Sequence, residues 1–155
     1  MKKIILFGIV IALVAMTANS QSLKEEVDYY QSIFGMAKKD VVASFVEVEE
    51  PVAVAFWTLY DEYEVSRKEL GKIRLELLIA YAENYLTMDA TVTDELILAM
   101  ATQKKNLDKL IVKYYKKMKK SAGVKPAAQF YQLENYFLSA IRLEILESIP
   151  FIGEF

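Results

Sequence analysis

Two arginines, Arg67 and Arg74, interrupt the longest apolar and aromatic helical pattern in this chain. The pattern runs from Phe56 to Met88 and places an apolar or aromatic residue at nearly every third or fourth position, which is the spacing of one helix face. A charged residue on such a face needs an oppositely charged partner, because an unpaired buried charge costs several kcal/mol. The two arginines are therefore either paired inside a helical core or exposed to a cleft in which they bind an anionic ligand.

The residues that face each arginine can be estimated from the positions of the turns, because short turns fold successive helices back as antiparallel neighbours. Turns near residues 48, 90 and 123 predict two polar layers across four helices. The first layer is expected to contain Tyr30, Arg67, Tyr114 and Glu134, and the second Arg74, Gln103 and Glu144. Such layers either fix the register of the helices or hold an anion between arginine and tyrosine side chains.

A lysine-rich block is the second feature that could bind a partner. Residues 104–125 contain nine lysines and one aspartate. Lysine near the end of a helix is favoured by the helix dipole, which is the simplest interpretation. The alternative is a basic binding face for anionic lipid, for another copy of the chain or for acidic segments of unfolded proteins. This face would contain Lys109, Lys113, Lys116, Lys117 and Lys120.

Several classes of chemistry are disfavoured by composition. The chain has no histidine and no cysteine, which removes the commonest general base, the commonest transition-metal ligand and thiol catalysis. Two acidic clusters, residues 47–50 and 61–64, lack a Ca²⁺-binding loop pattern and are typical of a solvated helix face. The block contains no arginine and the chain is acidic, so nucleic acid is an unlikely partner. We expect no enzymatic activity, no metal and no cofactor.

The first 20 residues have the order of a secretory signal peptide. Lys2 and Lys3 precede an apolar run from Ile4 to Met16, and small residues follow before Gln21. The run is shorter than the roughly 20 residues needed to span a bilayer. We therefore expect residues 1–20 to be removed, and the mature protein to be periplasmic or secreted.

The remaining residues, 21–155, predict a single all-α domain. Proline, glycine and asparagine are scarce, and no stretch alternates apolar and polar residues. The first helix is expected from Ser22 to about Val46, on a stripe that includes Val41 and Phe45. Three more helices are expected at about 50–87, 93–121 and 126–149. Four long antiparallel helices would form an elongated bundle or overlapping helical hairpins.

Several segments resemble a group of uncharacterised secreted helical proteins of Gram-negative bacteria. They are FWTLYDEY at 56–63, VTDE at 92–95, KYYKK at 113–117, QFYQLEN at 129–135 and Ile149-Pro150. More distantly, size, export signal and helix layout resemble the Spy/CpxP-like periplasmic proteins. Thr93 matches the threonine of their Leu-Thr-x-x-Gln motif, whereas the glutamine is not matched. The resemblance implies a dimeric, cradle-shaped, ATP-independent chaperone or stress regulator.

Taken together, these features predict a non-enzymatic helical protein that binds other proteins as a chaperone or envelope-stress component. Unfolded or envelope proteins are the expected partners, with membrane-surface contact through the lysine-rich face. The ten tyrosines exceed what a four-helix monomer needs, which favours a dimer face or an amphipathic binding surface, and we expect a homodimer. The alternative is a small-ligand or lipid-binding module that uses Arg67, Arg74 and nearby tyrosines.

Overall fold

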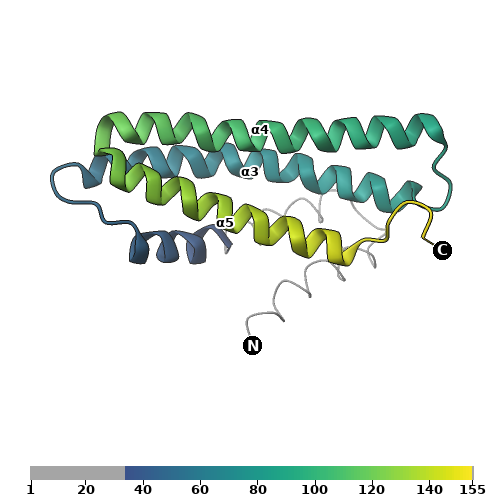
Figure 1. The fold of residues 1–155 in the computed structure, drawn as a ribbon, viewed down its shortest axis with the longest axis horizontal. Coiled ribbons are helices and arrows are strands. Elements are labelled where there is room, and N and C mark those ends of the chain that lie inside the picture. Colours follow the sequence, from purple (N-terminus) through teal and green to yellow (C-terminus); the bar gives the residue numbers. More distant parts are fainter. Residues whose placement is uncertain (1–33, 155) are drawn as a thin grey trace.

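The structure, a computed structural model, describes residues 34–154, and these form an elongated all-α bundle (Figure 1). A helix covers residues 34–45 and is followed by α3 (Ala53–Asn84), α4 (Ala90–Ala122) and α5 (Val124–Ser148). Each helix doubles back on the one before it, and α4 packs against both α3 and α5. The prediction of an all-α bundle of antiparallel helices is confirmed for this part of the chain. The predicted signal peptide, the Ser22 start of the first helix and Tyr30 lie outside the described residues.

The turns lie where the sequence predicts them, but some helix ends differ. Asp89 caps α4, and its carboxylate accepts a hydrogen bond of 2.9 Å from the Val92 N–H. Thr93, where the sequence predicts this helix to begin, lies inside the first turn because aspartate is a favoured cap and comes four residues earlier. At the next turn Gly123 alone separates α4 from α5, and its φ of 94° is a conformation that favours glycine. Pro126 is therefore in the first turn of α5, where its missing N–H costs nothing.

The core is aromatic and lies nearest the end that holds the turns at residues 46–52 and 123. Phe130 of α5 meets Tyr60 and Tyr63 of α3 edge-on, with ring centroids 6.3 and 5.0 Å apart. Tyr114 of α4 packs against Tyr63 at 5.5 Å. Beyond Glu64, Tyr81 is the one residue of α3 that is fully buried.

The buried face of the first helix differs from the predicted one. Val41 and Phe45, which were expected on the core stripe, are about half exposed, whereas Lys38, Val42 and Val46 are buried. The stripe is thus displaced by one residue. A stripe chosen from apolar residues alone passes through Val41 and Phe45. It misses the buried face because that face contains Lys38.

The C-terminal segment folds back onto the end of α3, where two tyrosine hydroxyls donate hydrogen bonds to its backbone carbonyls. The Tyr81 hydroxyl donates to the Pro150 carbonyl at 2.7 Å, and the Tyr85 hydroxyl donates to the Phe151 carbonyl at 3.0 Å. The side chains of Phe151 and Ile152 remain exposed. No helix in residues 34–154 is long and apolar enough to cross a membrane.

Candidate functional site

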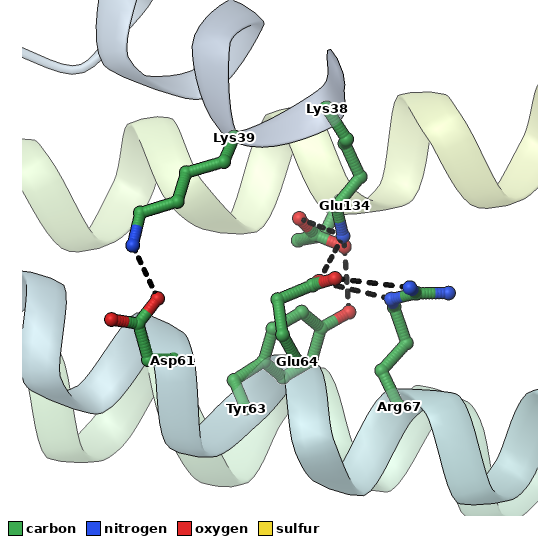
Figure 2. Close-up of polar contacts among 7 residues, drawn as sticks. All are labelled: Lys38, Lys39, Asp61, Tyr63, Glu64, Arg67 and Glu134. Atoms are coloured by element: carbon green, nitrogen blue, oxygen red, sulfur yellow. Dashed lines mark hydrogen bonds and ion pairs between the residues drawn. The ribbon is translucent and has the colours of Figure 1, made fainter. Parts of the chain in front are cut away.

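A buried lysine joins three helices at the edge of the aromatic core (Figure 2). Lys38, from the helix at 34–45, is only 3% exposed. Its ammonium lies 2.9 and 3.0 Å from the two carboxylate oxygens of Glu134 on α5, and it also bonds Glu64 on α3. Because the first helix, α3 and α5 each contribute one of these groups, the ion cluster fixes their relative positions.

Arg67 and Tyr63 complete the cluster from α3. Arg67 binds Glu64 with two parallel hydrogen bonds, from Nε at 2.9 Å and from Nη2 at 3.0 Å. The Tyr63 hydroxyl donates to Glu134 at 2.6 Å. Two cations therefore face two carboxylates, and the cluster is neutral. A neutral cluster in which the charged groups are hydrogen-bonded avoids most of the cost of burying charge.

Glycine at position 35 allows the first helix to approach α3 this closely. A Cβ atom built on Gly35 would lie 3.3 Å from a carboxylate oxygen of Glu64, which is closer than most such contacts. Glycine inside a helix costs about 1 kcal/mol relative to alanine. At Gly35 that cost is offset by the close approach that lets Lys38 reach its two carboxylates.

The cluster shifts the pKa values of Glu64, Tyr63 and the neighbouring Tyr60, and these shifts keep the carboxylate charged and the two phenols neutral. Burial alone would raise the pKa of Glu64, but Lys38 and Arg67 outweigh it and hold that pKa below its usual value. Burial and the neighbouring carboxylates raise the pKa values of Tyr63 and Tyr60. Neither phenol is therefore suited to act as a base or nucleophile near neutral pH.

Of the first predicted layer, Arg67, Tyr114 and Glu134 lie together and Tyr30 is outside the described residues, but the pairs differ from those expected. Glu134 was expected to pair with Arg67, whereas Lys38 and Tyr63 bind it and Arg67 binds Glu64. A glutamate three residues earlier on the same helix is within reach of Arg67 without crossing the bundle. Tyr114 is buried in this layer and contacts it through the Tyr63 ring.

Lys38 is the residue that sequence reasoning missed. One signal was available, because Lys38 lies four residues before Val42, which is itself four residues before Val46. A lysine on a face that otherwise contains valines is unusual enough to suggest a buried ion pair.

In the second predicted layer Gln103 lies within about a turn of Arg74, as expected, but the expected polar contacts do not form. Gln103 donates to the Leu70 backbone carbonyl at 3.0 Å instead of binding Arg74. Glu144 forms no ion pair with Arg74, and Arg142 of α5 pairs with Asp108 at 2.8 Å. Arg74 consequently has no hydrogen-bond or ion-pair partner among residues 34–154.

Arg74 lies beside a small cavity between the helices. Its lining includes Arg67, Gly71 and Arg74 from α3, with Ile111 of α4 and Ile141 of α5. The volume of about 20 Å³ has room for roughly one water molecule. Burial, with repulsion from Arg67 and Arg142, lowers the pKa of Arg74 to about 10. The cavity therefore carries an excess positive charge that the described residues do not neutralise.

The lysine-rich face lies on the outer side of α4. Lys109, Lys113, Lys116 and Lys120 are exposed and have no acidic partner within the described residues. Lys117 differs, because its ammonium lies 3.1 Å from Glu62 on α3. Four of the five predicted residues thus remain available to an external anion.

The described part of the chain contains no group of three or more residues arranged to hold a metal ion. Comparisons of this chain with protein-family models, with curated proteins and with solved structures gave no match. The function is therefore argued from the geometry of these side chains alone.

We predict that Lys38→Met destabilises the fold by about 3–5 kcal/mol, because it leaves Glu64 and Glu134 buried with one cation fewer. Arg67→Met should cost about 2 kcal/mol, since Glu64 keeps Lys38. Urea unfolding measures both free energies. Lys39→Met is the matched control, because its pair with Asp61 is on the surface and should contribute no more than about 1 kcal/mol. Equal losses for Lys38→Met and Lys39→Met would contradict a structural role of the cluster.

The lowered pKa of Glu64 predicts a loss of stability in acid. A carboxylate with a folded-state pKa below its unfolded value stabilises the fold above the unfolded pKa. That contribution disappears as the pH falls from the usual glutamate pKa of about 4.3 through the lowered one. Glu64→Gln should therefore be less stable than the parent at pH 7, and the difference should shrink towards pH 3. Urea titrations across this range test it, with the exposed Glu76→Gln as control. A difference that stays constant with pH would contradict the prediction.

Proposed function

We propose that this protein is a non-enzymatic helical protein that binds other proteins in the periplasm or outside the cell, as an ATP-independent chaperone or envelope-stress component. The observation that carries the proposal is the exposed row Lys109, Lys113, Lys116 and Lys120, which lacks acidic partners within the described residues. From the first to the last of these lysines the row extends about 16 Å along α4, at 1.5 Å per residue.

The helix dipole does not account for the row. Its effect is confined to the last turn of a helix, which in α4 contains Lys119 and Lys120. Lys109 and Lys113 lie several residues before that turn. An anionic partner along the helix would account for lysines over this length.

The surface between the lysines suits a partially apolar partner. Val112 lies between Lys109 and Lys113 in sequence and is 37% exposed. On α5, Tyr131 is 40% exposed and packs edge-on against Tyr115 of α4 at 5.8 Å. Lysine stems and exposed apolar groups together suit acidic, partly apolar segments, which unfolded proteins present.

A non-enzymatic role is supported by the state of the buried polar groups. The two carboxylates of the cluster each bind Lys38, and Arg67 is bound by Glu64. General acid–base catalysis needs a group that can exchange a proton with a substrate near neutral pH. Glu64 stays ionised, and Tyr63 stays protonated and donates to Glu134.

We predict that Lys116→Glu with Lys120→Glu weakens the suppression of client aggregation. Two charged contacts, each worth up to about 1 kcal/mol, should reduce affinity for an acidic client about tenfold. Light scattering of a thermally unfolded acidic protein measures the effect. Lys104→Glu with Lys119→Glu is the control, since both lysines are exposed outside the row and the net charge changes equally.

Two results would contradict the proposal. One is an unmodified protein that does not suppress aggregation at several-fold molar excess, and the other is an equal effect of the test and control variants. Vesicles of anionic phospholipid are the comparison partner, because a lipid surface presents the same charge. If the Lys116 and Lys120 variant binds vesicles more weakly than the unmodified protein does, but suppresses client aggregation equally well, the row is assigned to a membrane surface.

A second candidate function is the binding of a small anionic ligand, and Arg74 is the observation that favours it. Arg67 is bound by Glu64, so the site predicted around both arginines is reduced to Arg74. The adjoining cavity has the volume of about one water molecule. A ligand could therefore place a single anionic oxygen there, with the rest of its anionic group and its remainder outside the cavity.

Arg74→Met tests this candidate with laurate as the probe. Replacing a partly buried, unpaired cation by an apolar side chain should raise stability by about 1 kcal/mol in the absence of ligand. If the candidate is right, laurate raises the melting temperature of the unmodified protein and not that of Arg74→Met. Arg142→Met is the control, because that arginine is already paired with Asp108. An unmodified protein that laurate does not stabilise would contradict a fatty-acid carboxylate as the ligand.

A further inference from the structure

An apolar groove lies on the flank of the α3–α4 hairpin that faces away from the Lys38 cluster. Leu70, Ile73 and Leu77 of α3 form one wall, and Leu98, Thr102 and Asn106 of α4 form the other. The groove has a volume of about 380 Å³. Ile73 is 45% exposed and Leu98 is 59% exposed, so apolar side chains of both walls meet solvent.

Charges are arranged symmetrically about this groove along α4. Glu95, Leu98, Thr102, Asn106 and Lys109 follow one another at steps of three or four residues, which places them on one face of the helix. Glu95 precedes Thr102 by seven residues and Lys109 follows it by seven. Both charged side chains are exposed and have no oppositely charged partner within residues 34–154.

The order of charges on α4 is complementary to the same order on a second copy of α4 that runs in the opposite direction. A two-fold axis at Thr102 places Glu95 of one copy opposite Lys109 of the other, and the same pair recurs on the other side of the axis. Leu98 of each copy then lies opposite the partner's Asn106, and the two Thr102 residues meet at the axis. A parallel arrangement would place like charges together.

We propose that this protein forms an antiparallel homodimer through the α3–α4 groove, with its two-fold axis at Thr102 and with Glu95 of each copy paired to the partner's Lys109. Leu98 and the α3 wall of the groove supply apolar contact, and the charged pairs at its two ends fix direction and register. The proposal goes beyond the binding of client proteins and does not depend on it. Lys116 and Lys120, which test client binding, lie beyond the residues paired here.

Charge exchange tests the pairing. Sedimentation equilibrium over the micromolar range should show a dimer of the unmodified protein. Glu95→Lys and Lys109→Glu should each raise the dimer dissociation constant at least about tenfold, because each places like charges opposite one another. The double variant Glu95→Lys with Lys109→Glu should restore the dimer. Glu83→Lys and Lys119→Glu are matched controls, since both residues are exposed and lie outside the groove.

The absence of cysteine from the chain permits a test of the register. Thr102→Cys lies on the proposed axis, where two closely packed helices bring the two positions within disulfide range. It should form a covalent dimer on oxidation. Lys113→Cys is the control on the same helix, because its two copies would be about 33 Å apart at 1.5 Å per residue. Circular dichroism confirms that the variants are folded.

Three results would overturn the proposal. They are a monomer throughout the concentration range, a double variant that stays monomeric, and covalent dimers of Lys113→Cys that form as readily as those of Thr102→Cys. Suppression of client aggregation is measured separately with the Lys116 and Lys120 variants. Loss of the dimer and loss of client binding are therefore distinguishable.

Discussion

The contact of Lys38 with Glu64 and Glu134 is the interaction on which the arrangement of the helices depends. An ammonium group that is 3% exposed is stable only beside carboxylates, and these come from α3 and α5. The first helix can therefore take only the register that brings Lys38 between them. Gly35 makes this register sterically accessible, and Arg67 neutralises the second carboxylate. An apolar core alone would tolerate sliding of the first helix, whereas a buried ion cluster does not.

The sequence predicted the layers of the bundle better than the contacts inside them. Turn positions define which stretches face one another, so Glu134 and Tyr114 were correctly placed in the layer of Arg67. They do not define which partner a long side chain selects. Arg67 reaches Glu64 on its own helix, and that choice depends on distances of a few ångströms. Lys38 was missed because the core face of the first helix was assigned from apolar residues alone. That criterion cannot identify a buried face that contains a cation.

The two arginines of α3 show how unequal two similar sequence positions become after folding. Both lie on the same helical stripe, seven residues apart. Arg67 has a carboxylate one turn away on α3, whereas the residue three positions before Arg74 is Gly71, which has no side chain. Glycine at this position leaves space where a partner would otherwise be. The absence of an acid, and not the presence of an arginine, distinguishes the candidate ligand position from the structural one.

The outer face of α4 carries an order of charges that the fold does not require. Packing determines the inner face, where Leu107, Ile111, Tyr114 and Met118 are buried. On the outer face any mixture of polar residues would keep the helix soluble. The observed order runs from Glu95 through the exposed Leu98 to an uninterrupted row of lysines. Segregated charge raises the self-repulsion of one molecule, and contact with an oppositely charged surface would relieve it. Because the acidic and basic ends lie on one helix, a second copy of the chain can satisfy the middle of this face while the last lysines stay open to a different anionic partner.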